Sequence, residues 1–334
     1  GKLIYLSNQL NEDKGQKAYY ELQADIDLEG INWNPIKSLQ IIFILFMFLI
    51  IATSCGYDYI PVEEYQKLEG EEAYTEGDGT LDNPYVIDTK GKLIYLSNQT
   101  NEYKGNDLYY ELQADIDLGG IKWNPIHYFK GHFNGNGYEI SNFVIKNEYP
   151  DHKYYTSYIG LFEVNYGTIE RLGVTNFDID MNWTRRGIYS SIGGIAGINH
   201  NVIKDCYAIG RISGICTGTV GNPSIPSIGI VYSGGIATRN YSFASEMKAE
   251  IINCYSNVDV NDAIISHGWY NKIANTEDEA HDDRVTKGKN TNCAISGYEK
   301  KEYYTNELGW SEDIWDFDNP EFQNGGYLKL KRNK

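Results

Sequence analysis

The hydrophobic and polar positions between about Lys130 and Val260 follow one sequence motif that recurs along the chain, which we call the repeat phrase. Each clear copy has a Gly that opens an apolar triplet, an Asn five residues after that Gly, and an Ile further on. The clear copies read Gly160-Leu161-Phe162, Asn165, Ile169, Leu172; Gly194-Ile195-Ala196, Asn199, Ile203, Cys206; and Gly235-Ile236-Ala237, Asn240, Ile251, Cys254. A repeat of about 30 to 50 residues is typical of a solenoid, in which each repeat buries its apolar face only against its neighbours.

Stacking these copies predicts columns of inward-facing residues, with a looser first copy that ends in Ile140 and Phe143. The three columns are Ile140, Ile169, Ile203, Ile251; Phe143, Leu172, Cys206, Cys254; and Ile145, Val174, Ala208, Ser256. We expect Gly160, Gly194 and Gly235 at tight corners, where a positive φ or close stacking is needed. We expect each repeat Asn to bond its counterpart in the next coil through the side-chain amide.

The flanking segments have different periods. In Tyr110 to Leu118 apolar and polar residues alternate, which predicts a half-buried strand. Asp88 or Thr89 is placed to cap a short helix that runs to about Asn98. Together these elements predict a small α+β N-terminal cap. The aromatic-rich C-terminal segment is expected to close the open end of the sheets as a C-terminal cap.

The segments between the copies are longer and more polar than the repeats themselves. They cover 146–158, 177–191, 212–232 and 241–250. Insertions of a solenoid tend to fall on one face, so we expect binding specificity to lie in these segments.

The N-terminal 36 residues are a near copy of residues 91–126, with seven positions changed. This copy stops before the repeats, so we interpret 1–36 as a truncated duplicate of the cap that does not fold stably alone. We hypothesise that the natural start lies near Ile36 or Lys37.

Residues 37–55 have the pattern of a secretory signal peptide. Lys37 precedes an apolar run from Ile41 to Ala52, which is shorter than the ~20 residues that span a bilayer. Ala52-Thr53-Ser54-Cys55 resembles a bacterial lipobox, although Ala52 stands where Leu is usual. The resemblance implies lipidation of Cys55. A buried core element and an uncleaved membrane anchor are the alternative interpretations of residues 37–55.

The acidic segment 56–80 is predicted to be a linker.

The composition and net charge of the chain restrict the classes of molecule that it can bind. Lys and Arg total 29 against 46 for Asp and Glu, which gives a net charge of −17. Such a charge repels phosphate backbones, so nucleic acid is excluded as a partner. The 29 tyrosines and 34 glycines favour short strands and turns over helices. Cys206 and Cys254 are interpreted as small core residues of one column; a disulfide between coils is an open alternative.

Several short sequence motifs of this chain resemble those of bacterial surface proteins with GLUG repeats. Gly160-Leu161-Phe162 and Gly194-Ile195-Ala196-Gly197 match the repeat phrase. Ala114 to Leu118, Trp123-Asn124-Pro125-Ile126, Phe133 to Gly137 and Trp315 to Leu330 are similar to flanking segments of that family. The resemblance covers roughly residues 79–334. It implies a right-handed parallel β-helix, often lipidated or secreted, with a display or binding role, and it carries over no catalytic residue.

Candidate chemistry is sparse in the sequence. HExxH, GxSxG and GxxxxGK[ST] are all absent, so zinc peptidase, α/β-hydrolase and P-loop functions lack their minimal parts. Asp115 and Asp117 with Glu111, or the acidic run Glu277 to Asp283, offer oxygen ligands for Ca²⁺, but a solvated face is the favoured interpretation. A carbohydrate-active enzyme is the main rival function, with Asp178 and Asp180 as acid or base. Its candidate uronate-binding residues are Arg171, Arg185, Arg186, Arg211 and Arg239.

The sequence as a whole predicts a lipid-anchored, non-catalytic adhesion or binding module on the cell surface or outer membrane, facing outside. Tyr207 and Tyr255 are expected to face outward in neighbouring coils and to stack on sugar rings of a glycan, although a protein partner or a purely structural spacer are alternatives. No metal or cofactor is expected. The predicted domains are 1–36 (duplicate), 37–55 (signal peptide), 56–80 (linker), 81–128 (N-terminal cap), 129–295 (solenoid) and 296–334 (C-terminal cap).

Overall fold

The structure of the protein is a computed structural model. It describes residues 67–101, 107–146, 156–183, 189–216, 230–242, 249–261, 269–271, 286–287, 289–294 and 300–332. All of the described residues belong to one compact unit, Tyr59–Lys334. The predicted duplicate, the signal peptide and Cys55 lie outside the described residues. Among the residues that are described, no helix is both long and apolar enough to cross a membrane.

The described residues form mostly β-strands, which confirms the all-β class. Sheet A contains β1 (Tyr85–Ile87), β2 (Tyr109–Leu112), β4 (His132–Asn134), β9 (Thr168–Glu170), β13 (Val202–Lys204), β17 (Glu250–Ile252) and β21 (Lys289–Thr291), in that order. Sheet B contains β3 (Ile116–Asp117), β5 (Glu139–Ser141), β10 (Gly173–Trp183), β14 (Tyr207–Cys216) and β18 (Tyr255–Asn261), with β6 (Val144–Lys146) also paired to β10.

Two further sheets complete the main body. Sheet C contains β8 (Phe162–Asn165), β12 (Ala196–Asn199), β16 (Ala237–Ser242) and β20 (Thr286–Lys287). Sheet D contains β7 (Thr156–Ile159), β11 (Tyr189–Gly193), β15 (Ile230–Gly234) and β19 (Trp269–Asn271). The other elements are α3 (Lys90–Asn101), the π-helical turn η2 (Tyr303–Glu307), α4 (Pro320–Gln323) and the antiparallel pair β22 (Trp315–Asp316) and β23 (Lys329–Leu330).

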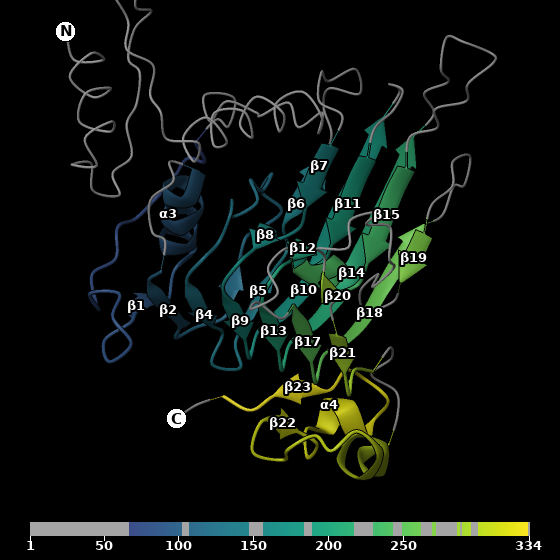
Figure 1. Ribbon diagram of the computed structural model, residues 1–334. Coiled ribbons are helices and arrows are strands. Elements are labelled where there is room, and N and C mark those ends of the chain that lie inside the picture. Colours follow the sequence, from purple (N-terminus) through teal and green to yellow (C-terminus); the bar gives the residue numbers. More distant parts are fainter. Residues whose placement is uncertain are drawn as a thin grey trace, which may run out of the picture. The chain divides into compact units, whose positions relative to one another are not determined.

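From β7 onward the chain visits the four sheets in the order D, C, A, B and then begins the same order again. We call each such round a pass. Within each sheet, a strand pairs in parallel with its equivalent in the next pass, apart from the antiparallel pair β16 and β20. Figure 1 shows these equivalent strands side by side, for example β9, β13, β17 and β21.

The interior of the stack contains the predicted isoleucine column, with one correction. Ile169, Ile203 and Ile251 are in register on sheet A and fully buried. Their neighbour in the earlier strand is Phe133 rather than Ile140. Phe133 and Ile140 are seven positions apart, whereas Ile169 and Val174 are five apart, because a turn with positive φ at Asn136 and Gly137 lengthens the first pass.

Ile140 belongs instead to the third column, where it pairs with Val174, which is followed by Ala208 and Ser256. The prediction placed Ile145 at the head of that column, but Ile145 pairs with Ile179. Phe143 is also displaced from its predicted column, and its ring stacks on Phe177 with 5.6 Å between centroids. The misalignment therefore has a single cause, the two extra residues in the Asn134 to Tyr138 turn.

A buried ladder of asparagine side chains follows sheet C and confirms the predicted role of the repeat Asn. Asn165 Nδ2 donates to Asn199 Oδ1 at 2.7 Å, and Asn199 Nδ2 donates to Asn240 Oδ1 at 2.8 Å. All three residues are almost fully buried. Asn165 and Asn199 also bond nearby backbone, as Asn199 Nδ2 does with Asn201 O and Glu250 O. The ladder thus satisfies buried polar groups at the corner between sheets C and A.

Close stacking, rather than a positive φ, explains the glycines of the repeat phrase. A Cβ on Gly160 would lie 2.7 Å from Gly193 O, and one on Gly194 would lie 2.5 Å from Gly235 O. Left-handed backbone occurs instead between sheets A and B. There the equivalent positions of four passes have φ near 50°, namely Arg171, Asp205, Asn253 and Asn292.

The helix expected near residue 90 is present as α3, which runs to Asn101. The Thr89 hydroxyl accepts a hydrogen bond from Lys92 N, as expected of an N-cap, and Leu93, Ile94 and Leu96 are buried. The strand expected over residues 110–118 is split into β2 and β3, because the two halves join different sheets.

Part of the acidic segment predicted as a linker packs on the cap. Asn98 Oδ1 accepts a hydrogen bond from Leu68 N at 2.9 Å, and its Nδ2 donates to Leu68 O. The ring of Tyr74 stacks on Tyr85 with 4.6 Å between centroids. The folded region therefore extends at least to Leu68.

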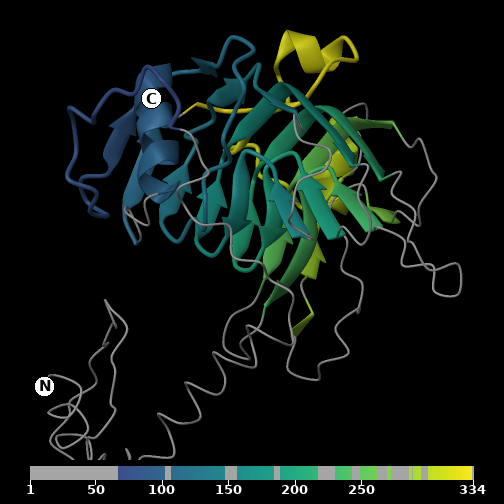
Figure 2. The ribbon, with the colours of Figure 1, turned by 90° about the horizontal axis from the view of Figure 1, so that it is seen from above.

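The C-terminal residues 300–332, which we call the strap, cross the outer face of the strands instead of closing their end. In Figures 1 and 2 the strap, in yellow, leaves the last strands and its end lies on the side of the first ones. Its contacts run from the last pass to the first: Trp310 with Asn292, Leu328 with Tyr255, Lys331 with Arg171, and Arg332 with Asp115. The predicted C-terminal cap is thus a lateral cover.

Candidate binding surface

Tyr207 and Tyr255, the predicted sugar-stacking residues, face outward from sheet B as expected but are fully buried. Their rings stack almost parallel with 5.3 Å between centroids. The strap covers them with Trp315, whose ring lies 6.3 Å from Tyr207 and 5.8 Å from Tyr255. The prediction of an exposed tyrosine row is therefore wrong, because an outward position on a sheet says nothing about what covers it.

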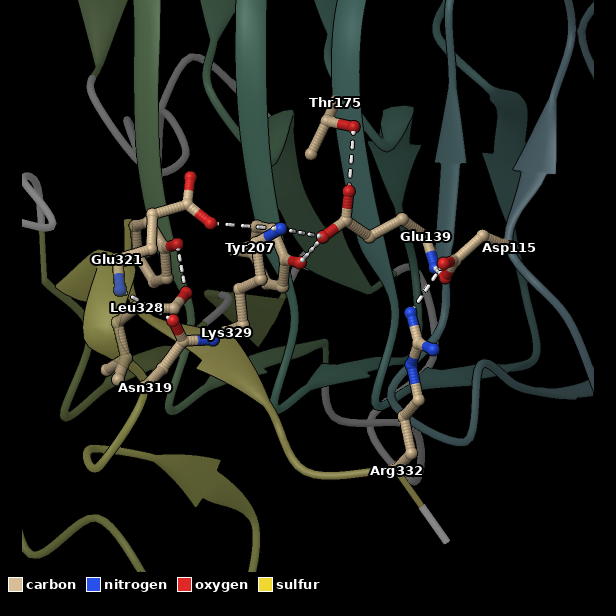
Figure 3. A network of polar contacts seen from close by, with 10 residues as sticks. Asp115, Glu139, Thr175, Tyr207, Asn319, Glu321, Leu328, Lys329 and Arg332 are labelled. Carbon is tan, nitrogen blue, oxygen red and sulfur yellow. Dashed lines mark hydrogen bonds and ion pairs between the residues drawn. The ribbon is translucent and has the colours of Figure 1, made fainter. Parts of the chain in front are cut away.

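A polar network under the strap fixes these tyrosines (Figure 3). The Tyr207 hydroxyl donates to Glu139 Oε1 at 2.7 Å, Thr175 donates to Glu139 Oε2 at 3.2 Å, and Lys329 lies 3.2 Å from Glu139 Oε1. Burial and the Glu139 carboxylate raise the pKa of Tyr207 well above its usual value, so the hydroxyl remains a donor. The network holds the strap on sheet B.

The residues considered for a uronate-cleaving site are not gathered in one place. Asp178 Oδ1 is 2.6 Å from Arg211 on the neighbouring strand, and Lys146 lies 4.0 Å from Asp178. Asp180 is in register with Lys146 and Ser213. Arg171 lies under the strap, where it donates to Lys331 O.

The remaining members of that proposed site are elsewhere. Arg239 is on sheet C, and Arg185 and Arg186 lie outside the described residues. Of the two described carboxylates of that proposed site, Asp178 forms an ion pair with Arg211 on the neighbouring strand, which is a structural arrangement.

The two aspartates considered for Ca²⁺ have partners within the fold. Asp115 accepts from Glu139 N and pairs with Arg332. Asp117 Oδ1 accepts from Asn142 Nδ2 and from Gly119 N, and these hydrogen bonds lower the pKa of Asp117. Across the described residues, no three His, Cys, Asp or Glu side chains are placed to hold a metal ion. The acidic run at 277–283 lies outside them.

An aromatic row follows the corner where the chain enters sheet A. The His127 and Tyr128 rings are 4.0 Å apart, those of Tyr128 and Tyr166 are 6.1 Å apart, and Tyr166 stacks on His200 at 4.7 Å. Tyr128 and Tyr166 are half-buried, whereas His127 and His200 are buried. The row comes from consecutive passes, because Tyr166 N bonds Phe129 O and His200 N bonds Asn165 O.

A charged cluster lies on the outer face of sheet A, next to the aromatic row in sequence. Glu170 contacts His132 Nε2 through Oε1 and Lys204 Nζ through Oε2, the latter at 2.7 Å. Burial raises the pKa of Glu170, but the hydrogen bonds from His132 and Lys204 outweigh it and lower the pKa to about 2. Glu170 is therefore a fixed carboxylate at neutral pH. The Tyr109 ring lies 5.4 Å from the His132 ring.

We call the aromatic row and the charged cluster together the sheet A surface. Its members supply hydroxyl and ring N–H groups, an ammonium and a carboxylate beside flat rings, which can bind a hydroxyl-rich ligand. The sequence interpretation missed it. The signal was present, because Glu170 and Lys204 each follow a column isoleucine and so occupy equivalent outward positions.

Comparison with known proteins gives partial similarities. No family model matches the chain. A protein of Evansella cellulosilytica, provisionally named a Gly-rich membrane protein, is 35% identical over 144 residues, which are 40% of this chain and 15% of that protein. Halomucin of Haloquadratum walsbyi is 30% identical over 149 residues, which are 41% of this chain and 2% of halomucin. The chain thus spans a small part of both relatives.

Among solved structures, similarity is found to a Bacteroides ovatus protein provisionally named an immunoglobulin A1 protease. The alignment covers 81% of this chain and all of that chain, with 18% identity and a TM-score of 0.39.

Proposed function

We propose that the main body is a right-handed parallel β-helix of the GLUG-repeat type. The recurring order of sheets D, C, A, B, the parallel in-register pairing of successive passes and the stacked asparagines support this proposal. Right-handedness follows from the general rule for parallel crossover connections. The glycines of the repeat phrase have a matching role, because they let adjacent passes approach closely.

The function that we propose is a non-catalytic glycan-binding or adhesion module at the cell surface, with the sheet A surface as its binding site. The observations that carry this proposal are the half-buried Tyr128 and Tyr166 of the aromatic row and the charged cluster, in which the fixed Glu170 carboxylate lies 2.7 Å from the Lys204 ammonium. Rings stack on the apolar faces of sugars, while Glu170 and Lys204 bond hydroxyl groups. The names of the two relatives agree with a membrane or surface location. That the chain catalyses no reaction stays a prediction.

A glycan array with the full chain tests this function. The comparison uses Tyr166→Ala and Lys204→Ala on the sheet A surface, with Tyr303→Ala and Arg211→Ala as controls of the same residue classes outside it. We expect the intact chain to bind a defined set of glycans and each sheet A variant to bind about tenfold more weakly, which corresponds to about 1.4 kcal/mol. Binding that is absent in the intact chain, or that is lost only in the controls, would reject the proposal.

The membrane attachment is a separate proposal that rests on Cys55. Acylation of a cysteine together with insertion of lipid chains holds a protein on a membrane without a spanning helix. Expression of the full chain and of Cys55→Ser, followed by separation of membrane and soluble fractions, tests it. We expect the variant to leave the membrane fraction, and an unchanged distribution would contradict lipidation at Cys55.

A further inference from the structure

Three cysteines lie at equivalent positions of consecutive passes, at the corner between sheets A and B. Tyr255 N donates to Cys206 O at 3.1 Å, and Ala294 N, next to Cys293, donates to Cys254 O at 2.9 Å. A parallel bridge between Tyr255 and Ala294 fixes the same alignment. The sequence interpretation placed Cys206 and Cys254 in this column, and the structure adds Cys293.

The side chains of this column point to the same side of the backbone. The Cys206, Cys254 and Cys293 thiols lie against carbonyls of the preceding strands, namely Ile169 O, Ile203 O and Ile251 O. Burial and then hydrogen bonds with the Cys206 and Cys293 thiols raise the pKa of Cys254 well above its usual value. Cys254 therefore lies between the other two cysteines, with its thiol on the same side of the backbone as theirs.

Neighbouring strands of a sheet are about 4.8 Å apart, which falls within the Cα separation of about 4.4 to 6.8 Å that disulfides tolerate. Exposure differs along the column. Cys206 and Cys254 are fully buried, whereas Cys293 is partly exposed and lies two residues after β21, the last described strand of sheet A. A reagent from solvent therefore reaches Cys293 first.

We propose that Cys293 and Cys254 form an oxidation site, at which a small-molecule disulfide converts the two thiols into a bridge between the last passes. The Cys293 thiolate attacks the reagent disulfide, which forms a mixed disulfide and releases one reagent thiolate. Cys254, as its thiolate, attacks the Cys293 sulfur, forms the Cys254–Cys293 bond and releases the second reagent thiolate. The protein loses two electrons and two protons, and the reagent is reduced to two thiols.

The second step is slow, because burial keeps Cys254 protonated and the attack needs its thiolate. The bridge joins the corner that follows β17 to the one that follows β21 and closes a loop through the chain between them. Closing such a loop restricts the unfolded chain, so oxidation is expected to raise the midpoint of thermal unfolding by roughly 5–10 °C. Reduction reverses the change.

The experiment uses the full chain with Cys55→Ser and Cys216→Ser, which removes the two other cysteines. This protein is incubated with oxidised glutathione, and its peptides are mapped by mass spectrometry without reduction. We expect an intact mass lower by two hydrogen atoms and a linked peptide pair that contains Cys254 and Cys293. A stable glutathione adduct on Cys293 without a bridge, or a bridge to Cys206 alone, would overturn the proposal.

Two further variants keep the test decisive. In Cys254→Ser the bridge cannot form, so glutathione is expected to remain on Cys293. In Cys206→Ala the bridge is expected to form as before. Circular dichroism verifies that each variant is folded. Loss of the bridge in Cys206→Ala would mean that Cys206, rather than Cys254, is the partner of Cys293, and the assignment would then be wrong.

Discussion

The inner core and the outer cluster under the strap are two hydrophobic regions of the same stack, built in different ways. In the inner core, aliphatic residues of successive passes lie in register, as Ile169, Ile203 and Ile251 do. In the outer cluster, single aromatic residues of the strap pack on two stacked tyrosines. The inner core is formed by contacts that recur in each pass, whereas the outer cluster depends on contacts that occur once.

This difference determines how far apart the contacting residues lie along the chain. Column residues are separated by one pass, for example 34 positions between Asn165 and Asn199. The strap joins residues 160 positions apart at Arg171 and Lys331 and 217 apart at Asp115 and Arg332. Long-range contacts carry a higher loop-closure cost, so we expect the strap to be the less stable of the two regions.

The largest expected effect comes from the centre of the outer cluster. Trp315 is fully buried and stacks on Trp310 with 4.5 Å between centroids. Trp315→Ala is expected to destabilise the strap by about 3–5 kcal/mol, as large aromatic truncations do. Limited proteolysis should then cut within 300–332, while circular dichroism retains the β signal. Simultaneous loss of the β signal would show that the inner core and the strap unfold as one cooperative unit.

The second effect concerns the asparagine ladder of the inner core. Asn199→Ala removes the middle side chain and leaves Asn240 Oδ1 and Glu250 O without that donor. We expect a loss of about 2–3 kcal/mol in the free energy of unfolding, measured in urea. The matched control is Asn324→Ala, an exposed residue whose amide bonds Pro320 O. A loss no larger than that of the control would mean that the ladder does not stabilise the stack.

The third effect is a pH dependence on the outer face of sheet A. The pKa of Glu170 is lowered from 4.5 to about 2 in the folded chain, so its stabilising contribution is present above pH 4.5 and is lost as the pH falls toward 2. Urea unfolding between these pH values should therefore show a weaker dependence in Glu170→Gln than in the unchanged protein. Parallel curves for the two proteins would contradict the assigned pKa.

The smallest effect is expected at the end of the strap. Arg332 pairs with Asp115, both half-exposed, and lies over the Tyr138 ring at 4.9 Å. Arg332→Ala should cost about 0.5 kcal/mol or less, since exposed pairs contribute little. Lys301→Ala, which removes the exposed pair with Glu312, is the control. A loss above about 2 kcal/mol in the free energy of unfolding would mean that this contact is a main contribution to holding the strap on the strands.

The sequence alone predicted the features that repetition encodes. The isoleucine column, the asparagine ladder and the Thr89 cap each depend on neighbours at a fixed spacing, and the structure confirms them. The first pass was misaligned, because the turn before Tyr138 changes that spacing without changing the alternation of residues.

What the sequence could not predict depends on contacts without a period. Tyr207 was correctly placed on the outer face, but its burial depends on Trp315, which lies far along the chain outside any repeat. The sheet A surface could have been predicted from the outward position of Glu170. Its fixed charge requires His132 and Lys204 on the two neighbouring strands.

Hydrogen–deuterium exchange of the unmodified full chain tests most directly whether the stack and the strap are two separate cooperative regions. We predict that the strand amides of Ile169 and Ile203 exchange slowest, and that the amides of 300–332 exchange faster and together, through opening of the strap alone. One common rate for the strap and the strands would contradict this account.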